Sequence, residues 1–287
     1  MKAVQVRALA KVNLTLDVIG RRADGYHELR SVFARISLGD DVRVRRSRSW
    51  HVAIHPPLDA RPDLAERAAH ELARRSGRDV AAAITIRKRI PLASGLGGGS
   101  SDAAAVLRAL GNLWRLDDAL LTAVAAKIGS DLPFFFHGAP LAEVGGRGEH
   151  VRAVAGGPWW GALALTSGRV STADAFARLA SGAWSDGQRT ARLVRALAAG
   201  AVDAAALRAL CGNDLDAVAV ALCPAIVALR ERMQPTPLFL SGSGAALFAI
   251  ADDRGHALAL ARRMRRADVR ASAIQIGLVE APSARSA

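Results

Sequence analysis

Cysteine is almost absent from this chain, and several other hallmarks of particular protein classes are missing too. Only Cys211 and Cys223 occur in 287 residues, and their spacing fits neither a C-x-x-C pair nor a disulfide framework, so we expect a protein of the reducing cytoplasm. No apolar run approaches the ~20 residues of a membrane-spanning helix, and the first residues lack the apolar core of a signal peptide. Zinc-type Cys/His spacings, an H-E-x-x-H motif and internal repeats are also missing, so the sequence identifies no metal ligands.

Lysine is scarce as well, although the chain is strongly basic. The formal net charge is +13, from 39 Lys and Arg against 26 Asp and Glu, yet only four of these cations are lysine: Lys2, Lys11, Lys88 and Lys127. A basic surface is the footprint of a nucleic-acid-binding protein. Alanine is abundant as well, and a GC-rich coding bias would enrich both alanine and arginine. We therefore attribute most of the charge to composition and expect neither a nucleic-acid nor a membrane partner.

Strand and helix patterns occur in both halves of the chain, which predicts an α+β protein. The best linker candidate is Gly156-Gly157-Pro158, so we expect an N-terminal domain over residues 1–156 and a C-terminal domain over residues 157–287. Hydrophobic periodicity and turn residues predict strands at 4–20, 29–46 with an interruption at 39–41, 80–87, 238–240, 246–251 and 270–279, and helices at 62–76, 103–113, 118–128, 173–181, 189–199, 203–210, 214–233 and 254–267.

The strongest chemical signal is a glycine-rich segment that leads from a strand into a helix. Residues 91–102 have the sequence PLASGLGGGSSD, and the glycines at 97–99 remove side chains where a backbone must approach a ligand closely. The serines at 100–101 open the helix, whose free N–H groups and dipole attract anions, so phosphate is the expected ligand. We interpret Asp102 as a helix cap and not as a ligand. The segment is neither a Walker A loop nor a G-x-G-x-x-G fingerprint, because the required letters are missing.

Two further segments place polar residues where a site could use them. Lys11 and Asn13 lie one pleat apart on one face of the first strand, and burying both requires a polar partner. The compact ammonium of lysine suits contact with a phosphate or a hydroxyl. Asp131 follows a helix and precedes an apolar run at 133–136 that we interpret as a strand. It is either a turn residue or the base that takes a proton from an attacking hydroxyl.

Two tight turns complete the set of candidate site segments. Tyr26, the only tyrosine, and His27 follow the hairpin turn Asp24-Gly25, where their rings could stack on and hydrogen-bond a base. The Ser-Gly-Ser-Gly sequence at 241–244 is a second glycine-serine turn. We expect it to face the same cleft as the glycine-rich segment.

Together these segments resemble the GHMP kinase superfamily, whose three motifs are matched in order by Lys11-Val12-Asn13, residues 91–101 and residues 240–244. Three features are most similar to the members that phosphorylate a cytidine diphosphate ester: RADGYHEL at 22–29, the triple glycine, and GSDLPFF at 129–135. The resemblance covers nearly the whole chain.

The resemblance implies a two-domain GHMP kinase fold, with an N-terminal domain like domain 2 of ribosomal protein S5 and a ferredoxin-like α/β C-terminal domain. It also implies an enzyme that uses ATP and Mg²⁺. This enzyme would phosphorylate the 2-hydroxyl of a cytidine diphosphate ester of methylerythritol, in the non-mevalonate isoprenoid pathway, as a monomer or weak homodimer.

Residue roles follow from the resemblance at matching positions. Asp131 would be the catalytic base and Lys11 its partner. Tyr26 and Phe176 would sandwich the cytosine, with His27 at its polar edge. The remaining substrate contacts would be Asn13, Phe33, Thr172, Gly242 and Ser243. The ATP-binding residues would be Lys88, Pro91, Leu92, Ala93, Ser94, Gly95, Leu96, Gly97, Gly98, Gly99, Ser100 and Ser101.

Alternatives remain open at this stage. A GHMP kinase for homoserine or mevalonate would have no base to hold between Tyr26 and Phe176. A nucleic-acid-binding protein would use the basic run at 43–48 and the one at 262–266, although the first run is equally typical of a solvent-exposed edge strand and the second of the wet face of a helix. Asp63 replaces an asparagine that is usual in the family, which leaves an adenosine contact at that position open.

Overall fold

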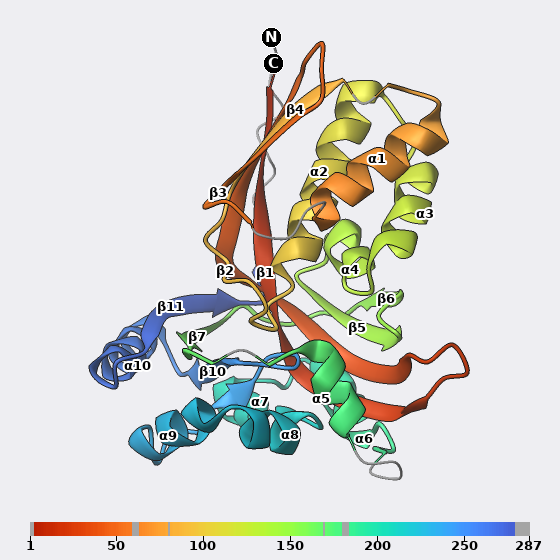
Figure 1. Cartoon of the computed structure of the whole chain (residues 1–287). Coiled ribbons are helices and arrows are strands. Elements are labelled where there is room, and N and C mark those ends of the chain that lie inside the picture. The colour runs from red at the N-terminus through yellow and green to blue at the C-terminus, as the bar shows by residue number, and fades with distance from the viewer. Residues whose placement is uncertain (1–2, 59–62, 80, 169, 180–183, 279–287) are drawn as a thin grey trace.

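The computed structural model describes residues 3–58, 63–79, 81–168, 170–179 and 184–278 and has an upper and a lower part in Figure 1. The strands are β1 Ala3–Arg21, β2 His27–Arg46, β3 His51–His55, β4 Ala82–Arg87, β5 Leu141–Gly146, β6 His150–Ala153, β7 Trp159–Leu165, β8 Gly212–Asn213, β9 Phe239–Leu240, β10 Ala246–Ala251 and β11 Arg270–Ile276. The helices are α1 Leu64–Ser76, α2 Gly98–Trp114, α3 Asp118–Ile128, α4 Leu132–His137, α5 Thr172–Arg178, α6 Gln188–Ala198, α7 Ala204–Leu210, α8 Asp216–Leu222, α9 Pro224–Arg232 and α10 Arg254–Arg266.

The first two strands form a long antiparallel hairpin that runs through both parts (Figure 1). Gly25 takes a φ of +86° in the connecting turn, a conformation that glycine adopts without steric cost. Residues 8–18 of β1 are all buried. Ala8 packs in the cluster under α1–α4, Leu14 in a central cluster, and Val18 in the cluster of the lower part. The hairpin therefore supplies core to the whole molecule.

The strands form two ladders that meet at one residue pair. β2 pairs with β1 along one edge, and with β4 and then β5 along the other, while β3 lies beyond β4. The lower ladder has the order β11-β7-β10-β9. Ile276 of β11 pairs with Ile36 of β2 and joins the two.

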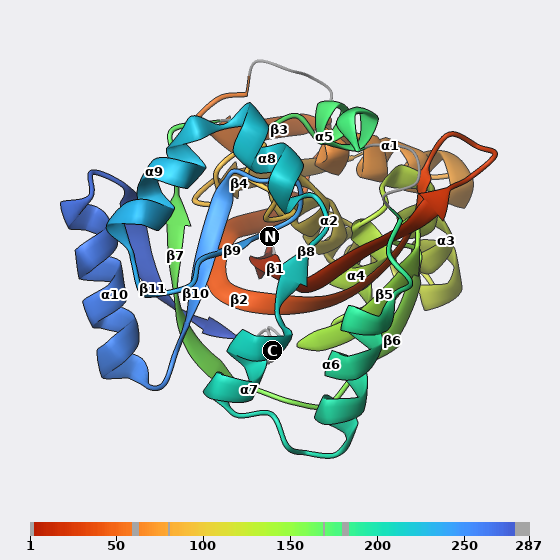
Figure 2. The same ribbon diagram turned by 90° about the horizontal axis from the view of Figure 1, so that it is seen from below.

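Helices cover both ladders. In the upper part, α1 to α4 pack over one face of the sheet (Figure 1). In the lower part, the alanine-rich face of β7 and β10 packs with α8, α9 and α10, and the opposite face packs toward α7 and the hairpin (Figure 2). Mixed helices and strands in both parts confirm the α+β prediction.

Most predicted helices are present, and α1 shows why. Asp63 accepts from the Glu66 N–H, and the Glu66 side chain accepts from the Asp63 N–H, which is a complete capping box. Ala65 and Leu72 are buried, and Gly77 ends the helix at a φ of +65°. Pro62, the first residue of the helix predicted at 62–76, lies outside the described residues, as do residue 80 and the predicted ends of the helix at 173–181 and the strand at 270–279.

Apart from helix boundaries, four predictions about the strands and helices were wrong. Residues 39–41 do not interrupt β2, which is continuous through Arg46. Its basic end at 43–46 lies between β1 and β4 and is not an edge strand. Residues 133–136 belong to helix α4, because Pro133 suits a first turn and the phenylalanines fill the core beneath α2. Residues 214–233 form two helices, since Pro224 cannot continue α8 and instead opens α9.

Candidate active site

The glycine-rich segment forms the N-terminus of α2. Gly97 has a φ of +70° and α2 begins at Gly98, five residues before the predicted start at 103, so the glycines lie in its first turn. Ser101 donates from Oγ to the Leu9 carbonyl at 2.7 Å, which anchors this turn to β1. No side chain caps the helix, so its first N–H groups remain available to an anion.

The turn at 241–244, called here the serine-glycine turn, packs directly against this segment. Ser241 donates from Oγ to the Gly95 carbonyl at 3.1 Å, and the Ala246 N–H donates to the Ser94 carbonyl at 3.2 Å. Gly95 has a φ of +78°, and a Cβ there would overlap the Ser241 carbonyl oxygen. The two glycine-serine segments, which we expected to face the same cleft, therefore pack directly against each other.

Lys11 is a buried lysine held by two neighbours. Its Nζ donates to Asn13 Oδ1 at 2.7 Å and lies 3.6 Å from Asp131 Oδ2. The Lys11 side chain is only 4% exposed and that of Asp131 is 30% exposed. Burial lowers the pKa of Lys11, and the Asp131 carboxylate opposes this shift. Lys11 and Asn13 thus share a face, as predicted, and Asp131 is the charged partner.

Local backbone geometry directs these side chains. The β1–β2 register shifts after Leu9 and again after Asn13, on both sides of the Lys11-Asn13 pair. Such irregularities bend a strand and re-aim its side chains. The Lys11 N–H donates to the Leu96 carbonyl at 3.0 Å, so the strand also holds the glycine-rich segment.

A cavity of about 650 Å³ opens beside Asp131. Its walls come from the β1–β2 turn, the approach to α4, the β5–β6 turn, α5, and the segment before α6. They comprise Arg21, Gly25, Tyr26, His27, Leu29, Ser130, Asp131, Arg147, Thr172, Ala173, Phe176, Ala177, Leu179 and Trp184. The cavity therefore brings together five of the predicted site residues: Tyr26, His27, Asp131, Thr172 and Phe176.

Aromatic rings fill one wall of this cavity. The ring of His27 stacks on Phe176 with centroids 4.8 Å apart and lies 5.8 Å from Trp184. Burial lowers the pKa of His27, and Arg21 adds to the effect. The Arg147 guanidinium lies over the Tyr26 ring, 5.1 Å from its centroid. Tyr26 is half exposed, so its ring is accessible to a ligand.

The other predicted substrate residues lie behind the cavity. Phe33 is buried, with the Lys11 ammonium 4.5 Å from its ring centroid. The Gly242 N–H donates to Asn13 Oδ1 at 2.9 Å, and Ser243 shares a 2.9 Å hydroxyl contact with Thr172. These residues connect the cavity to the serine-glycine turn.

Lys88 lies beneath the glycine-rich segment in a buried ionic cluster. Its Nζ is 2.5 Å from both Asp40 Oδ2 and Asp102 Oδ2. Burial acts to lower the pKa of Lys88, but the two carboxylates outweigh it and raise the value. Burial raises the pKa of Asp102 to about 8, with Lys88 opposing and Asp40 adding to the shift. The prediction that Asp102 caps the helix was therefore wrong: α2 begins earlier, and Asp102 lies in its second turn facing Lys88.

Three residues at the site were not found from the sequence. Arg147 and Trp184 line the cavity, and Asn213 holds the serine-glycine turn through its side-chain amide. Each lies on a segment with no motif of its own. An Asn-Asp pair opening a turn before α8 was the only signal for Asn213.

Within the described part of the chain, no group of three or more His, Cys, Asp or Glu side chains is arranged to hold a metal ion. Among those same residues, no helix is long and apolar enough to cross a membrane. The Asp63 side chain is the N-cap of α1, where it accepts a hydrogen bond from the Glu66 N–H.

The fold, the glycine-rich helix start and the adjoining Lys-Asp pair define a GHMP kinase. The model for the GHMP kinase N-terminal domain matches residues 63–139, and the model for the C-terminal domain matches residues 193–270. A homoserine kinase from Cytophaga hutchinsonii shares the fold, with a TM-score of 0.70 at 17% identity over 98% of this chain and 96% of that one.

Two relatives are more similar. The 4-diphosphocytidyl-2-C-methyl-D-erythritol kinase of Gloeobacter violaceus is 38% identical over 91% of this chain and 89% of its own. A crystal structure of 4-(cytidine 5'-diphospho)-2C-methyl-D-erythritol kinase has a TM-score of 0.81 at 35% identity, covering 96% of this chain and 99% of that one. This chain belongs to the family of 4-diphosphocytidyl-2-C-methyl-D-erythritol kinases. It is therefore a kinase that uses ATP, and its two-domain GHMP fold agrees with the sequence prediction.

Proposed function

We propose that this kinase transfers the γ-phosphoryl group of ATP to the 2-hydroxyl of 4-diphosphocytidyl-2-C-methyl-D-erythritol. One observation carries the proposal: Asp131 lines the aromatic cavity and lies 3.6 Å from the buried Lys11 ammonium, next to the open N-terminus of α2. An acceptor in the cavity and a phosphate on the helix would meet at this pair. The reaction belongs to the non-mevalonate route to isoprenoids.

The nucleotide phosphates would lie on residues 91–101, which include the first turn of α2. Free N–H groups and the helix dipole supply the positive potential there, and the glycines let the backbone approach. Lys88 lies under the same turn, close to where a Cβ on Gly98 would point. Its ammonium is buried between two carboxylates, so it would hold the turn in place from beneath the nucleotide phosphates.

Mg²⁺ fits this site through few protein ligands. A Cβ on Gly129, two residues before Asp131, would lie 3.7 Å from Ser100 Oγ, so the serine at the start of α2 lies beside the segment that carries the carboxylate. Mg²⁺ usually keeps several waters and is bound by few protein oxygens together with substrate phosphates. Ser100 would hold the ion through its hydroxyl, which leaves Asp131 free to take the proton. When bound, the ion would neutralise charge on the phosphates.

The chemistry of transfer falls to Asp131 and Lys11. The Asp131 carboxylate accepts the proton of the attacking hydroxyl, and the Lys11 ammonium stabilises negative charge on the transferring group. Asn13 fixes the direction of that ammonium through its Oδ1. Because the ammonium is desolvated, its electrostatic effect is larger than it would be in water.

The acceptor is held by the aromatic wall. Tyr26 and Phe176 would offer flat faces to the cytosine, and His27, whose ring stacks on Phe176, would lie at the polar edge of the base. The Arg147 guanidinium lies beside Tyr26 and would face the diphosphate. Thr172 and Ser243 join this wall to the methylerythritol end near Asn13. Both cysteines are free thiols, which suits the proposed cytoplasmic setting. The proposed oligomeric state is a monomer or weak homodimer.

The test is a direct reaction. The protein is incubated with ATP, Mg²⁺ and the cytidine ester, and the products are analysed for ADP and for an ester heavier by one phosphoryl group. Homoserine and mevalonate serve as competing acceptors in parallel reactions. Phosphorylation of either one in preference to the cytidine ester would overturn the proposed substrate.

A further inference from the structure

Asn13 is oriented by hydrogen bonds on both ends of its amide. Its Nδ2 donates to Ser31 Oγ at 3.0 Å, and the Ser31 hydroxyl in turn donates to the Thr15 carbonyl. This places Oδ1 toward two donors, the Lys11 ammonium and the Gly242 N–H. The position of the catalytic ammonium therefore depends on a peptide of the serine-glycine turn.

Asn213 is the residue that holds this turn in place. Its Nδ2 donates to the Gly242 carbonyl at 2.7 Å and to the Leu240 carbonyl at 3.2 Å, while its Oδ1 accepts from the Leu215 N–H at 2.9 Å. Asn213 is buried, and its amide donates to one carbonyl within the turn and to one in the residue that precedes it. Gly242 has a φ of +57°, so its flanking peptides adopt a conformation that the amide contacts help to fix.

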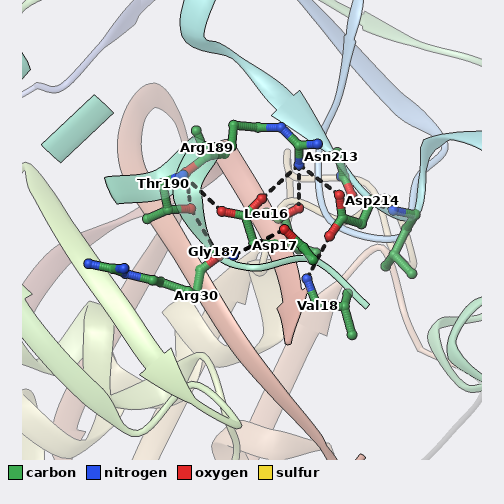
Figure 3. Close-up of polar contacts among 12 residues, drawn as sticks. Leu16, Asp17, Val18, Arg30, Gly187, Arg189, Thr190, Asn213 and Asp214 are labelled. Atoms are coloured by element: carbon green, nitrogen blue, oxygen red, sulfur yellow. Dashed lines mark hydrogen bonds and ion pairs between the residues drawn. The ribbon is translucent and has the colours of Figure 1, made fainter. Parts of the chain in front are cut away.

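Asn213 is itself anchored to β1. The short strand β8 pairs in parallel with Thr15 and Leu16. Asp214 accepts from the Val18 N–H, and Arg189 donates to both Asp17 and Asp214, as Figure 3 shows. The β1 residues that anchor Asn213, at positions 15–18, and the catalytic Lys11 thus lie on the same strand, on opposite sides of Asn13.

We propose that Asn213 is a positioning residue for phosphoryl transfer: by fixing the Gly242 peptide, it orients Asn13 and through it the ammonium of Lys11. This inference rests on the proposed roles of Lys11 and Asn13. The serine-glycine turn also contacts Gly95 of the glycine-rich segment and Thr172 of the cavity wall. By holding the turn, Asn213 therefore also keeps these two parts of the site at a fixed distance from Lys11.

The first test is a double-mutant cycle. Asn213→Ala should lower kcat about tenfold or more, with a smaller effect on KM, because a misplaced catalytic group costs rate even when substrates still bind. Asn13→Ala should also lower kcat. If Asn213 acts through Asn13, the double variant loses little beyond the larger single effect. Additive losses, or a kcat of Asn213→Ala within about threefold of wild type, would overturn the inference.

Asp216→Asn is the matched control. It weakens the nearby contact with Arg230 but leaves the amide of Asn213 on the turn and its anchor on β1 intact. We expect a lower melting temperature with kcat changed by no more than about twofold. An equal loss of kcat in both variants would show that Asn213 is only structural. If Asn213→Ala does not fold, Asn213→Asp keeps the acceptor for Leu215 and replaces the donor with a carboxylate facing two carbonyl oxygens, so the same cycle applies.

The second test does not use the substrate. The chain has only four lysines, so selective ¹⁵N and ¹³C labelling of lysine side chains gives a simple NMR spectrum. Asn213→Ala should shift the Lys11 side-chain resonances and leave those of Lys127 in place, because Lys127 pairs with the distant Glu71. Unchanged Lys11 resonances would overturn the inference. If the Lys11 resonances shift in Asn213→Ala but the wild-type protein does not phosphorylate the cytidine ester, the positioning role stands and the proposed substrate is refuted.

Discussion

Lys11 Nζ lies 3.6 Å from Asp131 Oδ2, across the boundary between a closed core and an open cavity. The lysine belongs to a buried strand, whereas the aspartate stands one residue before α4 and faces the cavity. The pair therefore places a desolvated cation and an accessible proton acceptor on either side of the space where a phosphoryl group would transfer. Its two members can be tested separately.

Replacing Asp131 with Asn removes the proton acceptor and keeps the shape. We expect kcat to fall by about 100-fold or more, the scale of losing a positioned base. Steady-state kinetics with the cytidine ester measure the effect. Asp118→Asn, on the exposed first turn of α3, is the control and should retain wild-type turnover. Near-normal turnover of Asp131→Asn would remove Asp131 from the mechanism.

Replacing Lys11 with Met separates catalysis from stability. Turnover should fall by about 100-fold or more, because a preorganised charge at the transferring group is lost. Stability should not fall, because burial of the ammonium already lowers its pKa and a methionine needs no solvation. Urea unfolding measures the second effect. A loss of more than about 1 kcal/mol in the free energy of unfolding would show that the ion pair stabilises the fold.

Replacing Tyr26 with Ala removes a ring that would stack on the cytosine. Stacking contributes about 1–3 kcal/mol per base and is felt equally in the bound ground state and the transition state, so KM should rise with little change in kcat. Tyr26→Phe keeps the ring and should behave as wild type. A fall in kcat at constant KM would argue for a role in the chemical step.

Replacing Gly95 with Ala tests the contact between the phosphate segment and the serine-glycine turn. The new Cβ would overlap the Ser241 carbonyl, at a backbone conformation that alanine rarely adopts. We expect a loss of more than about 1 kcal/mol in stability and a higher KM for ATP. Gly20→Ala, which has open space around the new Cβ, is the control for stability. Equal melting temperatures for the two variants would contradict the predicted overlap.

Replacing Asp102 with Asn tests the buried cluster through its pH dependence. Asp102 keeps its proton to about pH 8 in the folded state but loses it near 3.8 when unfolded. The folded state therefore binds more protons between these values, and the stability of the wild type should fall as pH rises from about 4 to about 8. Asp102→Asn lacks this contribution. Its free energy of unfolding, relative to that of wild type, should therefore increase by up to about 1.4 kcal/mol for each unit by which the pH rises within this range. Parallel stability curves for the two proteins would contradict the raised pKa.

The sequence predicted what local patterns determine. Hydrophobic periodicity located α1, and the Asp24-Gly25 turn located the β1–β2 hairpin. The spacing correctly indicated that Lys11 and Asn13 share one face of β1, because side chains two residues apart on a strand point the same way. The cavity residues Tyr26, His27 and Phe176 could be named because their segments resemble a family.

Other features depend on contacts between distant segments. Asp102 looked like a cap because glycine and serine are poor helix formers, yet the core beneath α2 extends the helix to Gly98. Its pairing with Lys88 and Asp40 joins three separate stretches of sequence. Asn213 contacts the serine-glycine turn across 29 residues and carries no motif, so only the three-dimensional structure reveals it.

The β1–β2 hairpin has a mechanical consequence. Its strands supply buried side chains to the core beneath α1–α4 and to the lower core, and β2 carries the pair that joins the two ladders. A hinge between the halves would have to bend this ribbon across Lys11 and Asn13. The hairpin therefore opposes bending of the two halves against each other at the catalytic centre.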